Sequence, residues 1–114
     1  MLRSFRRIFR RTLFSCAIAA VGSAQADVVV VLNSRDATVQ LLDQATYKDL
    51  GTLPVGKEPH HLMSTPDNKS LIVASSVGNE LIFLDPKSCQ VQRTVKDILD
   101  PYQIGFSPDQ KWFV

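Results

Sequence analysis

Two consecutive stretches, at 28–69 and 70–111, carry the same pattern and decide the fold. The first reads VVVVLNSRDATVQLLDQATYKDLGTLPVGKEPHHLMSTPDNK, and the second reads SLIVASSVGNELIFLDPKSCQVQRTVKDILDPYQIGFSPDQK. Overlaid without a gap, they share nine identical pairs: Val31/Val73, Ser34/Ser76, Leu42/Leu84, Asp43/Asp85, Thr52/Thr94, Pro59/Pro101, Pro66/Pro108, Asp67/Asp109 and Lys69/Lys111. Residues 112–114 begin a third copy. A fixed period of about 40 residues is typical of repeat proteins, so each stretch is one repeat unit.

The internal pattern of each unit favours strands over helices. Val28–Leu32 and Val39–Leu42 are short apolar runs rich in β-branched residues, and Leu71–Ala74 and Leu81–Leu84 repeat them. No sustained apolar period of about 3.6, the helical value, follows Ala26, so we expect an all-β protein with four short strands per unit. Leu81–Leu84 is apolar on both faces, which a β-propeller blade satisfies because neighbouring blades cover it on both sides.

Six residues at the ends of the apolar runs are interpreted as structural turn residues. A carboxylate directly after a strand can accept a hydrogen bond from the backbone two residues on. A proline at the second position of a turn has its φ angle already set for type I geometry. The six residues are Asp43, Pro66, Asp67, Asp85, Pro108 and Asp109.

Residues 1–26 have the pattern of a secretory signal peptide. Five arginines and no acidic residue lie within 1–11, the apolar run Leu13–Gly22 follows, and Ala24-Gln25-Ala26 is a small-residue cleavage signature. We therefore predict a signal peptide at 1–26 and a periplasmic or secreted bacterial protein. The pairs Arg6-Arg7 and Arg10-Arg11 leave the general and the twin-arginine export routes both open.

Charge and cysteine content after the leader exclude several classes of protein. Residues 27–114 hold eight Lys and Arg against eleven Asp and Glu, and a mildly acidic domain is not expected to bind nucleic acid. No apolar stretch approaches the roughly 20 residues needed to span a bilayer. Cys89 is the one cysteine left, so a disulfide within the mature chain and a cysteine zinc site are not expected.

The order of motifs resembles the YVTN-type β-propeller repeat. The segments that carry the resemblance are VVLN at 30–33, TVQLLD at 38–43, LPVGKEP at 53–59 and TPDN at 65–68, with IVAS at 72–75 and SPD at 107–109 in the second unit. Such repeats are similar to the haem-binding propeller of dissimilatory nitrite reductases. Where the family has glycine after Pro-Asp, this chain has Asn68 and Gln110.

The resemblance implies about two four-stranded blades of a larger, seven-bladed propeller. Pro59–Ser64 is then the innermost strand of a blade, beside the central channel, and residues 70–75, 80–85 and 89–95 are its outer strands. Residues 28–53 supply three strands of an earlier blade, and residues 101–114 open the next, with Trp112 and Phe113 expected in the core. Two units cannot close a ring, so we expect residues 27–114 to be the N-terminal part of a longer propeller.

The two adjacent histidines, His60 and His61, are the candidate cofactor-binding residues. On a channel-lining strand, an imidazole could ligate haem or a metal, or carry a proton. The alternative is a polar strand start, because the second unit has Tyr102-Gln103 instead and adjacent strand residues point to opposite faces. No catalytic constellation and no metal motif is recognised.

Two functions of different class remain open. The first is an exported, non-enzymatic propeller scaffold that binds a protein or a small ligand in the periplasm. The second is a haem-handling or lactonase-like propeller enzyme whose site lies mostly in blades beyond this sequence. The fold does not choose between them, because propellers host many unrelated activities.

Overall fold

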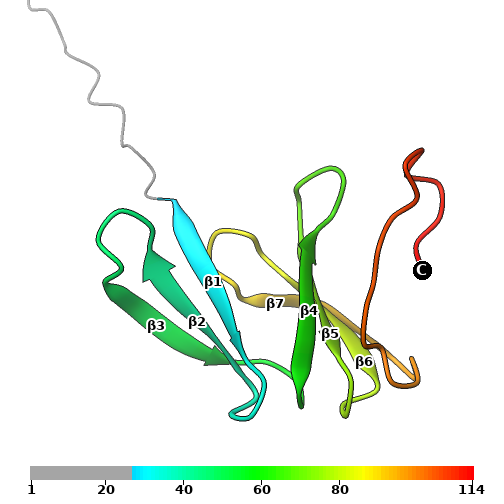
Figure 1. Cartoon of the computed structure of the whole chain (residues 1–114), viewed down its shortest axis with the longest axis horizontal. Helices are drawn as coiled ribbons and strands as arrows, with labels where there is room; N and C mark the ends of the chain where they lie inside the picture. The colour runs from blue at the N-terminus through cyan, green and yellow to red at the C-terminus, as the bar shows by residue number, and fades with distance from the viewer. Residues whose placement is uncertain (1–26) are drawn as a thin grey trace, which may run out of the picture.

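The computed structural model describes residues 27–114, and the predicted signal peptide at 1–26 lies outside the described residues. Within that range the chain forms two antiparallel sheets and no helix (Figure 1). The all-β prediction is therefore confirmed. The strands are β1 (Val28–Asn33), β2 (Thr38–Asp43), β3 (Asp49–Pro54), β4 (Pro59–Ser64), β5 (Leu71–Ser75), β6 (Glu80–Leu84) and β7 (Val91–Lys96).

The first sheet has the strand order β1-β2-β3, and the second has the order β4-β5-β6-β7. All neighbouring strands are antiparallel and follow one another in the chain. This up-and-down arrangement is that of a propeller blade. The last strand pair of each sheet has an extra residue, Leu50 opposite the Leu41–Leu42 step and Gln92 opposite the Phe83–Leu84 step.

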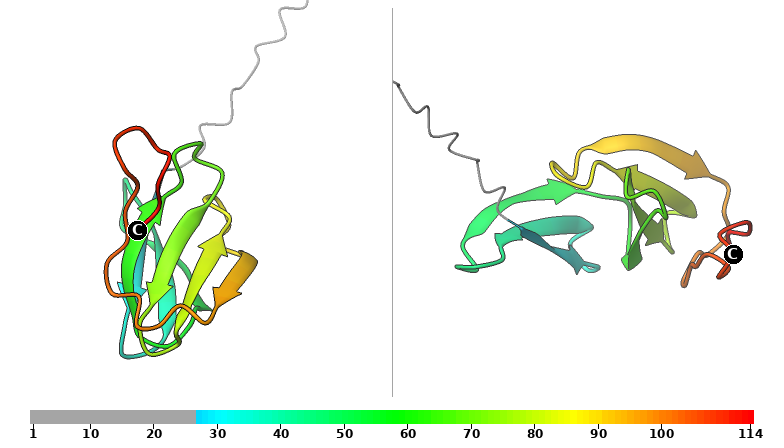
Figure 2. Two further views of the ribbon diagram at one scale, coloured as in Figure 1. Left: turned by 90° about the vertical axis from the view of Figure 1, so that its right-hand side faces the viewer. Right: turned by 90° about the horizontal axis from the view of Figure 1, so that it is seen from above.

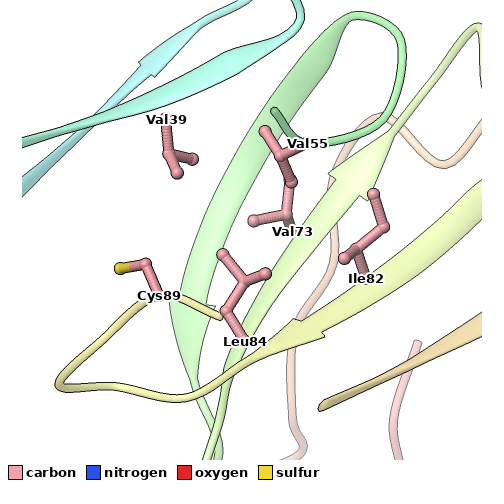
Figure 3. Close-up of a cluster of buried hydrophobic side chains, with 6 residues drawn as sticks. All are labelled: Val39, Val55, Val73, Ile82, Leu84 and Cys89. Carbon is pink, nitrogen blue, oxygen red and sulfur yellow. The ribbon is translucent and has the colours of Figure 1, made fainter. Parts of the chain in front are cut away.

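The two sheets lie side by side with a shared core between them (Figure 2). Val39 comes from the first sheet, and Val55 comes from the connection to the second. The second sheet and its last turn supply Val73, Ile82, Leu84 and Cys89. Figure 3 shows these six side chains gathered between the sheets, and all of them are buried. Sheet-to-sheet packing covers the apolar strands, as expected for neighbouring blades.

Backbone geometry follows the same period as the sequence. Among residues 27–114, eight of the nine non-glycine residues with positive φ form four pairs that lie one repeat unit apart, which are Ala37/Asn79, Tyr47/Cys89, Glu58/Asp100 and Asn68/Gln110. Their φ angles lie between 44° and 59°, in the left-handed region that few side chains favour. Gln110 adopts φ 59° even though asparagine or glycine suits this conformation better. The turn geometry is set by the position in the unit more than by the residue.

Residues 101–114 pack on the other face of the second sheet and end in a hairpin. Ile104 and Phe106 join Ile72, Leu81 and Phe83 in a second core. Phe106 pairs with Phe113, one repeat unit after the pairing of Ser64 with Leu71. The hairpin therefore repeats, one unit later, the turn that joins β4 and β5.

The expectation that Trp112 and Phe113 lie in the core is wrong. Trp112 is 71% exposed and Phe113 is 39% exposed. Residues 107–114 form a single hairpin, and among residues 27–114 no further sheet packs on its outer side (Figure 2). Their side chains therefore meet solvent on that side.

Candidate functional site

The candidate site lies where β4, the first strand of the second sheet, begins. Pro59, its first residue, is buried, and the Ser34 hydroxyl of the first sheet donates a hydrogen bond to the Pro59 carbonyl at 2.6 Å. This bond joins the start of β4 to the neighbouring sheet. It holds the first residues of the strand in a fixed place.

His60 is exposed and lies at a β-bulge. Pro59 pairs with Ser75 and His61 pairs with Ala74, so His60 is the extra residue between them. A bulge bends the strand and redirects a side chain, and bulges are frequent beside functional sites. The strict alternation that would send the two imidazoles to opposite faces is therefore interrupted here.

The His60 ring packs on the ring of Tyr102. Their centroids are 3.7 Å apart with an interplanar angle of 35°. Tyr102 lies one repeat unit after His60, just after the buried Pro101, and is 59% exposed. Two residues that lie one repeat unit apart thus form one exposed aromatic pair. Sequence reasoning treated Tyr102 as a replacement for the histidine in the next unit, although the period itself could have suggested that these positions are neighbours.

His61 is half-buried and pairs with Ala74 inside the sheet. In the described residues, no group of three His, Cys, Asp or Glu side chains is placed to hold a metal ion. Cys89 is consistent with a structural role, because its side chain is buried. The pKa of its thiol is raised first by this burial and second by the nearby Asp85 charge. What the site offers chemically is an exposed imidazole and a phenol in contact.

The loops at this end of the blade are tied together by serines. The Ser75 hydroxyl donates to the Lys57 carbonyl at 2.6 Å, and the Ser76 amide donates to the Glu58 carbonyl at 3.1 Å. Beside them, a shallow pocket of about 470 Å³ opens between the two sheets, with Lys57 and Glu80 as its charged lining residues. His60 is not part of this pocket, so the two features are separate.

The four recurring aspartates lie in turns outside this site. Asp43 Oδ1 accepts hydrogen bonds from the Thr46 hydroxyl at 2.7 Å and the Thr46 amide at 2.8 Å. Asp85 Oδ1 accepts from the Ser88 amide at 2.9 Å and the Lys87 amide at 3.0 Å. These donors stabilise the charged carboxylates and hold the pKa of both below its ordinary value.

The second pair of aspartates is bound by the hydroxyl two residues earlier. Thr65 donates to Asp67 Oδ1 at 2.7 Å, and Ser107 donates to Asp109 Oδ1 at 2.6 Å. These hydroxyls are the main cause of the lowered pKa of both carboxyl groups. Pro66 and Pro108 lie inside the same turns, which are closed by the Asn68 and Gln110 amides.

Comparison with protein families identifies a propeller family. The family model described as YNCE-like β-propeller matches residues 8–114. No curated protein matches the chain. In the part of the chain that the structure describes, no helix could cross a membrane.

Solved structures are similar to this chain over a small part of their own length. Kuenenia stuttgartiensis hydrazine synthase shares 26% identity at a TM-score of 0.63, over 74% of this chain and 24% of that one. Dihydro-haem d1 dehydrogenase NirN in complex with DHE shares 21% at a TM-score of 0.64, over 82% and 20% respectively. Pseudomonas aeruginosa periplasmic gluconolactonase PpgL shares 20% at 0.38, over 71% and 29%. The chain therefore spans less than a third of each of these proteins.

Proposed function

The chain belongs to the YNCE-like β-propeller family, and on this basis we propose that it is an exported scaffold that binds a protein or small ligand in the periplasm. In this proposal residues 1–26 are the signal peptide that directs export. Binding takes place at the blade end where β4 begins. The proposal assigns no reaction to the chain.

The observation that carries this proposal is the exposed pair His60–Tyr102. Aromatic rings provide a large contact area at low entropic cost, and histidine and tyrosine add polar groups at the edge. The pair follows two buried prolines, because Pro59 and Pro101, the residues directly before His60 and Tyr102, are both buried. The recurring aspartates are already bound within turns. They are therefore poor candidates for acid–base catalysis.

A haem-handling protein is the second candidate, favoured by one specific observation. His60 presents an exposed imidazole on the inner strand, and a histidine nitrogen is a common axial ligand of haem iron. NirN, which is similar in fold, is named as a dehydrogenase of dihydro-haem d1. An imidazole binds iron through the in-plane lone pair of a ring nitrogen, so the contact of Tyr102 with one face of the His60 ring does not occupy the bonding direction. No observation on the described residues favours the lactonase-like alternative.

Binding at the aromatic pair can be tested with the immobilised full chain and a periplasmic extract of the source bacterium. We expect a component that is retained by the unmodified chain and by Trp112→Ala, and lost by both His60→Ala and Tyr102→Ala. Trp112 is the matched control because it is also an exposed aromatic residue. Equal retention by all four proteins would contradict the proposed site.

The haem alternative has its own measurement. Haemin is titrated into the full chain, and the Soret absorbance band is followed. A shifted band that His60→Ala abolishes and His61→Ala retains would favour the haem-handling candidate. A spectrum equal to that of free haemin would remove it.

Export is tested by fusing residues 1–26 to alkaline phosphatase, which becomes active after export from the cytoplasm. We expect activity from this fusion and none from a fusion of residues 27–114. Equal activity of the two fusions would contradict a signal peptide at 1–26. This result is independent of the binding site.

A further inference from the structure

The pocket at the junction of the two sheets is a site separate from the aromatic pair. Its volume is about 470 Å³, which is within the range of small-molecule sites. Its walls come from three places in the chain, which are the β1–β2 turn, the connection from β3 to β4, and the β5–β6 turn. Both sheets and the segment that joins them therefore build this pocket.

Hydrogen bonds hold the backbone walls of the pocket in place. The Val55 amide donates to the Ala37 carbonyl at 2.8 Å, which ties the connecting segment to the first sheet. The Ser75 hydroxyl donates to the Lys57 carbonyl at 2.6 Å, which ties the same segment to the second sheet. A Cβ atom at Gly78 would clash with this hydroxyl, so the β5–β6 turn also packs closely on Ser75. A pocket whose walls are already fixed lowers the entropic cost of binding a ligand.

Two residues of opposite charge line the pocket. Lys57 is exposed, and Glu80 is half-buried at the start of β6. Glu80 Oε1 lies beside the β5–β6 turn, 3.1 Å from the position that a Cβ atom on Gly78 would occupy. Among residues 27–114, neither Lys57 nor Glu80 forms an ion pair. Within this part of the chain, one ammonium and one carboxylate at the same pocket can therefore pair with a ligand.

The remaining side chains of the pocket are apolar. Ala37 comes from the first sheet, Pro54 and Val55 come from the connecting segment, and Val77 comes from the second sheet. Val77 is 56% exposed, so a ligand could remove apolar surface from water there. The pocket thus offers one cation, one anion and a small apolar surface.

We propose that this pocket binds a free α-amino acid with a small apolar side chain. The Lys57 ammonium donates to the ligand carboxylate, and the Glu80 carboxylate accepts a hydrogen bond from the ligand ammonium. Such charge-assisted hydrogen bonds are about twice as strong as neutral ones. The ligand side chain packs on Val77. A zwitterion pairs with both charges of the pocket at once, whereas a simple carboxylate or amine pairs with only one.

Nuclear magnetic resonance of the ¹⁵N-labelled full chain tests the proposal with L-valine as the probe. Gly56 and Gly78 line the pocket, whereas Gly51 and Gly105 do not. We expect the amide signals of the first two to shift in a saturable manner, with a Kd of about 1 mM or lower, while the other two stay unchanged. Isovalerate lacks the ammonium of valine and isobutylamine lacks its carboxylate, and each should bind about tenfold more weakly or less. No saturable shift, or equal affinity for L-valine and either analogue, would overturn the proposal.

Substitutions of the charged residues assign the contacts. Lys57→Gln and Glu80→Gln should each weaken L-valine binding by about tenfold or more, because each removes one charge-assisted bond. Lys48→Gln and Glu58→Gln are the matched controls, since both residues are exposed and lie outside the pocket. Unchanged Gly51 and Gly105 signals show that each variant is folded. If folded Lys57→Gln and Glu80→Gln bound L-valine as tightly as the controls do, the assignment would be wrong.

This result is independent of the function proposed above. Neither His60 nor Tyr102 lines the pocket, so the L-valine titration and the retention experiment report on different sites. Failure of one leaves the other unaffected.

Discussion

At Gly56 the backbone passes close to two buried side chains. A Cβ atom there would lie 2.5 Å from Ile82 Cδ1 and 2.6 Å from Ser75 Oγ, and the φ angle is +22°. Ser75 cannot easily move away, because it is fully buried and its hydroxyl binds the Lys57 carbonyl. This position is therefore restricted to glycine by both space and backbone conformation.

We expect Gly56→Ala to lower the free energy of unfolding by about 2–3 kcal/mol, because it adds overpacking to backbone strain. Urea unfolding measures the change. Gly105→Ala is the matched control, since a Cβ at Gly105 meets no atom within 4 Å, and its effect should stay within about 0.5 kcal/mol. Equal effects of the two substitutions would contradict the close approach at Gly56.

At the scale of the elements, the hairpin turns depend on charged carboxylates. Asp85 accepts two backbone amides and one hydroxyl, and Asp43 binds Thr46 in the same manner one unit earlier. Because such donors favour the ionised form, folding lowers the pKa of these groups. Their contribution to stability is present above the pKa of the unfolded chain, about 3.9 for aspartate, and is lost as the pH falls through the lower folded pKa.

Asp85→Asn should therefore destabilise the chain at pH 7 and have less effect as the pH approaches 3. The measurement is urea unfolding of the variant and the unmodified chain at pH 7, 5 and 3. Asp36→Asn serves as the control, because the hydrogen bond described for Asp36 uses its backbone amide. A difference between Asp85→Asn and the unmodified chain that does not change with pH would exclude ionisation as the cause.

On the scale of the whole molecule, the two sheets share one core and should unfold together. Val39 of β2 and Leu84 of β6 are both 0% exposed and belong to the same cluster. Leucine at such a site fills space that the surrounding residues cannot close. The sheets therefore depend on each other for burial, as neighbouring repeats do.

Leu84→Ala is expected to lower the free energy of unfolding by about 2–5 kcal/mol. In a double-mutant cycle, Leu84→Ala and Val39→Ala should couple by about 0.5–3 kcal/mol because they contact one shared core. Leu84→Ala combined with Leu50→Ala is the control pair and should be additive, since Leu50 is 50% exposed. Additivity of both pairs would mean that the sheets unfold independently.

The all-β fold could be predicted because its signals are local. Apolar runs such as 81–84 and turn residues such as Asp85 are read directly from the sequence, and the period of the repeat places each strand in the order of a blade. Some details escaped that reasoning. The exposure of Trp112 depends on which surfaces pack on the 107–114 hairpin. The residue type alone does not specify these tertiary contacts.

The amino-acid sequence by itself determined the repeat, the turn chemistry and the propeller class, because these follow from short-range steric and hydrogen-bonding preferences. Only the tertiary structure decided that His60 and Tyr102 touch, that His60 is the bulged residue, and that Cys89 is buried while its counterpart Tyr47 is exposed. Two residues that lie one repeat unit apart meet only when their two segments are packed side by side, so their contact is a property of the packed units and not of either segment.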